Sequence, residues 1–323
     1  MTILAAKKGP IRSGTAALEL LSAPLSLQLL QGLQEGSKSP IELRRDIGSP
    51  PQSTVRIYLR TLEEIKTISR VLDPGLRGST EYGLEAPGLA LMTVAASLQR
   101  WLSFSPQGPI ELGTPAARNA TKALFEGLSS NVVRALAGRA LSLTELARLI
   151  PRISYPALDR RLTAMRLVGL IEAHRGDGRA TPYQPTDWLR HAVSPLTSAS
   201  EWEREHIPEM TPPIGRLDVE AVFLLAAPLM KLPPTLTGKV RLAVEIQRGV
   251  SPLFAGVVVC FEEGEAISCT AGLDGEAEAW VSGTPRSWLR RMNQGEDGHL
   301  ELGGDSQIAR AVLDGLARTT SKP

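Results

Sequence analysis

The sequence predicts a mainly α-helical protein with an additional α+β segment at its C-terminal end. Three observations predict this class: an apolar pattern that occurs twice, two Pro-rich boundaries, and a change from helical to alternating hydrophobic spacing after residue 216. The chain has 323 residues, 42% of them hydrophobic, which is enough for two or three domains with their own cores.

An internal repeat organises the first two thirds of the chain. A shift of 103 residues places SPIELRRDI (39–47) on SLTELARLI (142–150), with five of nine residues identical. Apolar residues on both sides of this match also coincide. They are Leu25, Leu29, Leu30, Leu33, Val55, Leu59, Leu62, Ile65 and Ile68 in the first copy and Leu128, Val132, Val133, Leu136, Leu158, Leu162, Met165, Val168 and Ile171 in the second. Two long copies indicate a domain duplication rather than a solenoid.

Further along, the shift becomes 101 residues, which matches Tyr82 with Tyr183 and Trp101 with Trp202. A two-residue difference in one loop would produce this slip. The two Trp residues are expected to lie in cores or interfaces. We expect three domains, and their ranges are 16–103, 116–210 and 217–323.

Within each copy we expect a helix, a short helix, a tight turn, a third helix, a hairpin and a final helix. In the second copy Ser129 can cap the first helix, and Ser142 with Glu145 forms a capping box for the short one. Ser154 can cap the third helix, and Pro156 is tolerated because it lies in the first helical turn.

The third helix of the second copy has two different faces. Leu158, Leu162 and Met165 share the buried face, which leaves Arg160 opposite them and Arg161 and Arg166 on the flanks. A short helix, a turn and a helix with a free outer face form a helix-turn-helix, whose second helix lies in the DNA major groove. The segment HRGDGRATPY that follows is typical of a basic wing.

These segments resemble the winged-helix transcriptional regulators of the HxlR and MarR type over residues 16–206. YGLEAPG (82–88) matches the family's Y-x-L-T-x-x-G strand, and YQPTDWL (183–189) keeps its Tyr and Thr. The resemblance implies binding to double-stranded DNA. Because two copies share one chain, we expect an intrachain pseudo-dimer, with a homodimer as the other arrangement.

The candidate DNA contacts come from both copies. In the second copy they are Ser154, Tyr155 and Arg160 near the groove, Arg161 and Arg166 at phosphates, and Arg175 and Arg179 on the wing. In the first copy they are Gln52, Ser53, Thr54, Arg56, Arg60 and Arg77, with Lys66 and Arg70 nearby. Ile57 and Tyr58 replace Arg160 and Arg161, so the first copy is expected to bind more weakly. The alternative for any single arginine is a solvated or ion-paired surface residue.

Charge is distributed unevenly along the chain. Residues 1–210 contain 25 Lys and Arg against 20 Asp and Glu, whereas residues 211–323 contain 11 against 14. A polyanion is therefore expected to contact the basic front part.

The C-terminal segment follows a different pattern. VRLAVEIQ (240–247), FAGVVVCFEEGEAISCTAG and GEAEAWVSG predict strands, and TPRSWLRRMNQG and SQIARAVLDGLART predict helices, the last one capped by Asp305 or Ser306. Residues 217–319 resemble the sterol carrier protein type 2-like fold, which implies an apolar ligand cavity. The candidate cavity residues are Val244, Ile246, Val257, Val259, Trp280, Trp288, Leu289 and Met292, with simple core packing as the alternative.

Enzyme motifs are absent from the sequence: it has no P-loop, GxSxG, HExxH or G-x-G-x-x-G after a strand. Its two cysteines lack zinc-site spacing and its four histidines are dispersed, so no metal or cofactor is expected. No signal peptide or run of about 18 apolar residues occurs, which indicates a cytoplasmic protein without a membrane partner.

The sequence therefore predicts a non-enzymatic, DNA-binding transcriptional regulator whose C-terminal domain senses a hydrophobic small molecule. Two alternatives remain open. One is a protein-interaction adaptor, and the other is a lipid or small-molecule carrier with accessory winged helices.

Overall fold

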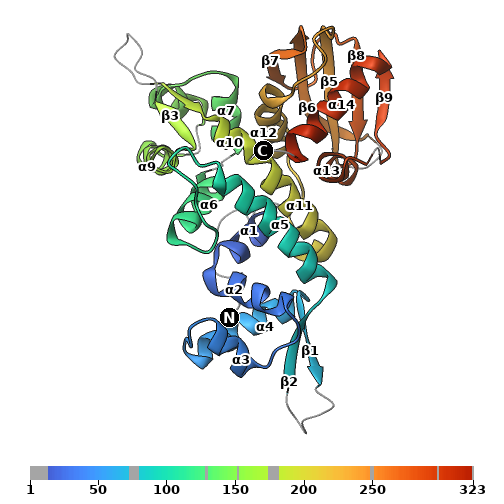
Figure 1. Ribbon diagram of the computed structural model, residues 1–323. Helices are drawn as coiled ribbons and strands as arrows, with labels where there is room; N and C mark the ends of the chain where they lie inside the picture. The colour runs from blue at the N-terminus through green and yellow to red at the C-terminus, as the bar shows by residue number, and fades with distance from the viewer. Residues whose placement is uncertain are drawn as a thin grey trace. The chain divides into compact units, whose positions relative to one another are not determined.

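The computed structural model describes residues 14–72, 80–127, 130–150, 153–173, 182–247, 251–296 and 298–321. Within these residues the chain is a mixed α and β protein in which helices predominate, as the coarse fold class predicted (Figure 1). None of the described helices is by itself long and apolar enough to span a membrane. Helices α1 (Thr15–Ser22) and α2 (Pro24–Gln34) reach that length and composition only together, across a bend of 83°.

The chain forms two compact units. The first contains residues 1–103, 110–121 and 198–212, and the second contains residues 104–109, 122–197 and 213–323. Helices α6 (Pro115–Gly127) and α11 (Val193–His206) have residues in both units. The C-terminal segment thus shares a unit with most of the second repeat.

The first unit contains the first repeat. After α1 and α2, its elements are α3 (Pro40–Asp46), α4 (Gln52–Glu64), β1 (Ile68–Leu72), β2 (Thr80–Leu84), α5 (Ala86–Ser103) and the 3-10 helix η2 (Pro208–Met210). Strands β1 and β2 form an antiparallel hairpin in which Ile68 pairs with Leu84. Lys38 adds an isolated bridge to Tyr82. Val55, Leu59 and Leu62 of α4 are buried, and the helix packs against α2.

The second unit begins with the second repeat. Its elements here are α7 (Ser130–Gly138), α8 (Leu143–Leu149), α9 (Tyr155–Leu167), β3 (Ile171–Ala173), β4 (Tyr183–Pro185) and α10 (Asp187–His191). Strands β3 and β4 are antiparallel, and Leu141 forms an isolated bridge to Tyr183. Leu141 and Tyr183 correspond to Lys38 and Tyr82, so the repeat predicted from the sequence is also a repeat of structure.

The turn after the third helix of each repeat has the same geometry. Thr67 donates its N–H to Leu62 at 3.0 Å, and Leu170 donates to Met165 at 2.9 Å. The residue before each donor has a positive φ, 58° at Lys66 and 85° at Gly169. The second copy therefore uses glycine where the first accepts a left-handed lysine.

The C-terminal segment forms one sheet and three principal helices. Its elements are α12 (Arg216–Ala226), the 3-10 helix η3 (Ala227–Leu229), β5 (Gly238–Gln247), β6 (Leu253–Glu262), β7 (Glu265–Ala271), β8 (Ala279–Gly283), α13 (Pro285–Gln294), β9 (Glu301–Gly304) and α14 (Ser306–Ser321). The strand order is β7-β6-β5-β8-β9 (Figure 1). Strands β5 and β8 are parallel, and the other neighbours are antiparallel. The strands and helices predicted at 240–319 are confirmed, and Asp305 caps α14 through Gln307 and Ile308.

Helix α12 packs against α7 of the second repeat as well as against strand β6. Glu220 on α12 is fully buried and forms ion pairs with Arg134 of α7 and with Arg216, the latter at 2.7 Å. A buried carboxylate needs such partners because an uncompensated charge is costly to desolvate. This cluster ties the second repeat to the C-terminal segment within one unit.

A second buried carboxylate, that of Glu203, joins α11 to the start of α1 within the first unit. Glu203 of α11 is 1% exposed and accepts hydrogen bonds from the backbone N–H groups of Gly14 at 2.5 Å and Ala17 at 2.9 Å. It therefore accepts hydrogen bonds from N–H groups at the start of α1 that have no partner within the helix. Burial raises the pKa of Glu203 to about 7, although the hydrogen bonds oppose this shift.

Candidate nucleic-acid interface

Helix α9 presents the strongest candidate surface. Leu158, Leu162 and Met165 are each 0% exposed and hold one face of the helix in the core. Pro156 lies in the first turn, as predicted, and Ser154 occupies the N-cap position without making the capping hydrogen bond. The Ser154 side chain is therefore not engaged by the helix that it precedes.

The outer face of α9 is basic. Arg160 and Arg166 are exposed, and Arg161 is half-buried on a flank. The Arg160 Nε donates to the backbone oxygen of Pro156 at 3.3 Å. Within the described residues, none of these three arginines forms an ion pair with a carboxylate. They are thus available to phosphates.

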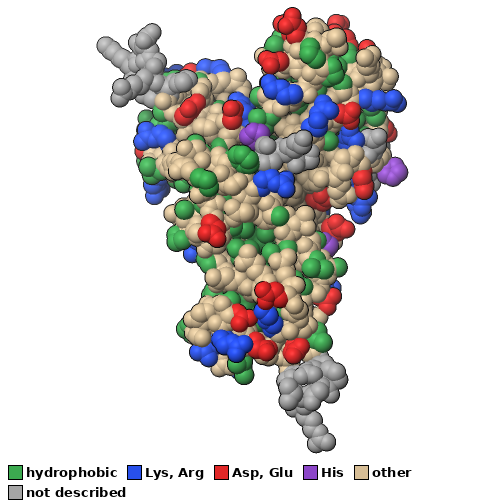
Figure 2. Space-filling view, in the orientation of Figure 1, with side chains coloured by type: hydrophobic (Ala, Val, Ile, Leu, Met, Phe, Trp, Pro, Cys, Tyr) green, Lys and Arg blue, Asp and Glu red, His purple; other side chains and the backbone are tan. Residues whose placement is uncertain are grey.

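The start of α9 adds an aromatic group. Tyr155 is 52% exposed, beside the exposed Ser154. Hydroxyl groups at the start of a recognition helix can reach base edges or phosphates. The predicted groove contacts Ser154, Tyr155 and Arg160 are therefore all on the accessible surface, and Figure 2 shows basic side chains at the edge where α9 lies.

The short helix before α9 is firmly capped. Ser142 and Glu145 form the predicted capping box, with the Ser142 N–H donating to Glu145 Oε2 at 2.8 Å. Arg139 also contacts Glu145, at 3.1 Å. These hydrogen bonds, those from Ser142 first, lower the pKa of Glu145 to about 2. The carboxylate is therefore engaged by its own helix and does not offset the charge of α9.

Helix α4 presents the corresponding surface of the first repeat. Gln52, Ser53 and Arg56 are exposed, and Thr54 is half-buried. The position that corresponds to Arg160 is Ile57, which is 52% exposed. The outermost group of α4 is thus apolar where that of α9 is cationic.

Two arginines of the first repeat are already paired. Arg60 donates to Glu64 at 2.9 Å, and Arg70 on β1 holds Glu63 through Nε and Nη2, both at 3.0 Å. The hydrogen bond to Glu63 is the main cause of the raised pKa of Arg70. These glutamates neutralise cations that a phosphate would otherwise contact.

The three predicted wing arginines lie outside the described residues. They are Arg77, Arg175 and Arg179. Their contribution to DNA binding therefore remains a prediction from the sequence.

No protein-family model matches this chain, and no curated protein is significantly similar to it in sequence. The case for a nucleic-acid interface therefore rests on the geometry of α4 and α9.

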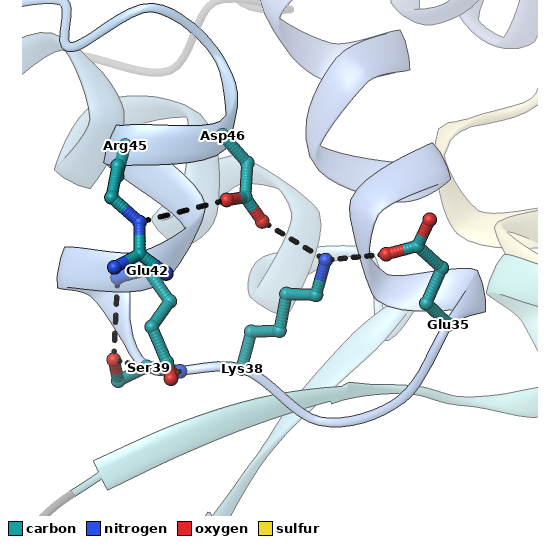
Figure 3. Close-up of polar contacts among 6 residues, drawn as sticks. All are labelled: Glu35, Lys38, Ser39, Glu42, Arg45 and Asp46. Atoms are coloured by element: carbon teal, nitrogen blue, oxygen red, sulfur yellow. Dashed lines mark hydrogen bonds and ion pairs between the residues drawn. The ribbon is translucent and has the colours of Figure 1, made fainter.

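A polar groove of about 610 Å³ lies between α2 and α3 in the first repeat. Figure 3 shows Lys38 between two carboxylates, bonded to Glu35 at 2.7 Å and to Asp46 at 2.9 Å. These hydrogen bonds raise the pKa of Lys38. Arg45 approaches Asp46 at 4.0 Å, and Ser39 and Glu42 form the capping box of α3. The cations here are locally compensated, so the groove is a poor site for phosphate.

The predicted cavity residues of the C-terminal segment divide into two groups. Six of them are buried: Val244, Val257, Val259, Trp288, Leu289 and Met292. Trp288 also donates from Nε1 to Ala243 at 2.9 Å and contacts Phe223 edge to face. Ile246 is half-buried near the end of β5.

Trp280 lies on the other face of the sheet. It pairs with Arg241 across β5 and β8, whereas Val240, Leu242 and Val244 alternate with Arg241 and point the opposite way. Its ring lies over Gly303, where an added Cβ would be 2.2 Å from it. The structure therefore does not bring Trp280 together with the six buried residues.

Sequence reasoning missed the ion pairs that distinguish the two repeats. The Arg60–Glu64 pair had a sequence signal, because residues four apart share one helix face. Arg134 and Glu220 are 86 residues apart and carried no such signal. Their contact depends on how α12 packs on α7.

Proposed function

We propose that this protein is a DNA-binding transcriptional regulator. The observation that carries the proposal is the outer face of α9, where Arg160, Arg161 and Arg166 have no carboxylate partner within the described residues. Unpaired arginines on an exposed helix face are the electrostatic signature of a phosphate-binding surface.

The order of elements supports a more specific fold assignment for both repeats. In each, a first helix is followed by a bridge residue, a short capped helix, a third helix and a two-stranded hairpin. We infer that the segments 16–103 and 116–210 are winged-helix domains, with α4 and α9 as their recognition helices. The two would form an intrachain pseudo-dimer, in a cytoplasmic protein that needs no cofactor.

Salt dependence and selectivity test this proposal. We expect sequence-selective binding to genomic fragments that weakens steeply as salt rises, with a shared motif among the recovered fragments. Arg160→Ala is expected to reduce affinity and to lower the salt slope by about one. Arg310→Ala, on the exposed side of α14, is the matched control. Binding that is insensitive to salt and equal for both variants would refute the proposal.

The C-terminal segment supports a sensory role in the same proposal. We infer a sterol-carrier-like domain at 217–323 whose buried apolar residues accommodate a hydrophobic effector. Because α12 packs on α7, an effector that favours one arrangement of α12 would change DNA affinity by the same coupling factor. An apolar ligand that binds the whole protein but leaves operator affinity unchanged would exclude this mechanism.

One observation favours a second function for the first repeat. Ile41 is 78% exposed on α3 and Ile57 is 52% exposed on α4, where a DNA-reading surface would carry polar groups. This favours protein docking by the first repeat, as in an adaptor. Ile57→Arg separates the two functions, because it should strengthen DNA binding if α4 faces DNA and leave it unchanged if α4 docks a protein.

A further inference from the structure

The side chain of Arg190 is a largely buried cation that forms no hydrogen bond with the described residues. It lies at the C-terminal end of α10, and its side chain is only 17% exposed. Its Nη1 has no access to solvent and no hydrogen-bond partner in the described part of the chain. Within the described residues its one ion-pair partner is Asp187, whose Oδ1 is 4.0 Å from Nε and whose side chain is 89% exposed. A contact of this length is not a hydrogen bond.

Among the described residues, the elements around Arg190 supply no compensating charge besides the exposed Asp187. Helix α10 packs on α12 and β4, and Cys269 of β7 is close enough to interact with the guanidinium. Burial raises the pKa of the Cys269 thiol to about 12, so the thiol is neutral near pH 7. Burial also lowers the pKa of Arg190 itself. A desolvated guanidinium beside a neutral thiol is an unfavourable arrangement for the free protein.

The neighbouring residue adds a second unused group. The Nδ1 of His191 is also buried and has no hydrogen-bond partner among the described residues, and burial lowers the pKa of His191. The end of α10 therefore carries two groups able to donate hydrogen bonds and, within the described residues, no carboxylate closer than Asp187.

The first repeat shows that this position does not require a cation. At the shift of 101 residues, Arg190 corresponds to Leu89 of α5, which is 56% exposed. An apolar side chain would be more favourable at the largely buried position of Arg190 than at the exposed position of Leu89. The arginine thus occupies a place where packing alone favours leucine.

We propose that Arg190 anchors a binding site for a small anion, bearing a carboxylate or a phosphate group, at the C-terminal end of α10. The planar guanidinium binds either group through two parallel hydrogen bonds, and its partial desolvation strengthens the attraction. The accessible part of the side chain gives the anion its approach. This site requires no DNA and goes beyond the proposed regulatory function.

Thermal unfolding of the full chain with inorganic phosphate or acetate tests the site. Sodium chloride at equal ionic strength corrects for general salt effects. We expect one of the two anions to raise Tm saturably, by about 5 °C at roughly 100 times its Kd, and the better anion identifies the ligand class. Arg190→Met should raise Tm without anion and abolish the response, whereas the control Arg310→Met should respond as the wild type does.

Two results would overturn the proposal. One is a wild-type response to phosphate and acetate no larger than the response to chloride, and the other is an undiminished response of Arg190→Met. Arg190→Lys covers the case in which the Met variant does not fold, since it keeps the charge but loses the planar fork. Its affinity for the better anion is expected to fall about tenfold, and an affinity equal to that of the wild type would also contradict the proposed site.

Discussion

The two repeats share one framework but differ at the surface that would meet DNA. Helix α4 carries two arginines and two glutamates, whereas α9 carries three arginines and one aspartate. The buried stripes are equivalent: Val55, Leu59 and Leu62 correspond to Leu158, Leu162 and Met165. The duplication has thus kept the core pattern and changed the outer faces independently of it.

The groove beside the short helix shows the same divergence. Lys38 and Asp46, which form an ion pair in the first repeat, correspond to Leu141 and Leu149 in the second. Gln31, which lines the open groove of the first repeat, corresponds to Arg134, which pairs with Glu220 of α12. In the first repeat this position lines an open groove. In the second repeat the corresponding position on α7 contacts α12 of the C-terminal segment. Under the proposed function, DNA binding is therefore expected chiefly from α9.

The largest expected effect is on DNA affinity. Reversing the charge of both exposed arginines of α9, as Arg160→Glu with Arg166→Glu, should weaken binding about 100- to 1000-fold, since each reversal replaces attraction by repulsion at a phosphate. Arg60→Glu on α4 should change affinity much less, because Arg60 is already paired with Glu64. Fluorescence anisotropy at several salt concentrations measures both. Equal losses for α4 and α9 would show that the repeats bind DNA equivalently.

The next effect concerns a buried position that differs between the repeats. Glu203 corresponds to Leu102, and both are almost inaccessible. Because burial raises the pKa of Glu203 to about 7 in the folded chain from 4.5, the folded state binds more protons than the unfolded state between these values. The stabilisation is complete below pH 4.5 and is lost as pH rises through about 7, a change of the order of 3 kcal/mol.

Urea unfolding between pH 5 and 8 checks this expectation. The free energy of unfolding should fall with pH in the wild type, and Glu203→Gln should flatten the dependence because the amide does not ionise. Glu205→Gln, exposed on the same helix, should leave the pH dependence intact. A flat wild-type profile would show that the N–H groups at the start of α1 stabilise the carboxylate fully.

Local signals in the sequence predicted the elements of both repeats and the C-terminal sheet. Helical spacing placed Leu158, Leu162 and Met165 on one buried face, and the Ser142–Glu145 spacing identified a capping box that the structure confirms. Alternation predicted β5, and the apolar segments after it predicted β6 to β8, although these patterns did not reveal that Trp280 faces away from Val244. Strand phase depends on which face the helices cover, and the sequence pattern contains that information only weakly.

Long-range contacts account for what the sequence could not predict. Helix α12 was not expected, and its pairing of Glu220 with Arg134 joins residues that are distant in sequence. The buried state of Arg190 likewise follows from the packing of α10 on α12 and β4. Such contacts are set by tertiary packing, which composition and spacing do not encode locally.

A smaller effect is expected at the turn after the third helix. Gly169 has φ of 85°, and an added Cβ would lie 2.7 Å from Cγ of Pro106. Gly169→Ala should therefore cost about 2 kcal/mol, from the left-handed backbone together with the close contact. Lys66→Gly, at the equivalent turn, should be neutral or stabilising by less than 1 kcal/mol, on the order expected for relief of a left-handed residue. Chemical denaturation measures the free energy of unfolding of both variants. If Lys66→Gly destabilises the protein as much as Gly169→Ala does, the left-handed backbone is not the cause of the cost at Gly169.

The smallest expected effect is the loss of stability when either capping box is removed. Ser142→Ala and Ser39→Ala should each cost about 1 kcal/mol at pH 7, because each removes the side-chain acceptor for an N–H of its helix. Glu145 has a further partner in Arg139, and its pKa is lowered to about 2, whereas the pKa of Glu42 is lowered chiefly by its hydrogen bonds with Ser39. A lowered pKa means that the stabilisation is present above pH 4.5 and is lost as pH falls toward 2. At acid pH the difference between the wild type and Ser142→Ala should therefore shrink, because Ser142 Oγ then loses its carboxylate partner and keeps only the N–H of Glu145. Thr144→Ala, an exposed hydroxyl deletion on the same helix, should cost less than Ser142→Ala at pH 7, and an equal cost would mean that the capping box contributes nothing beyond helix propensity.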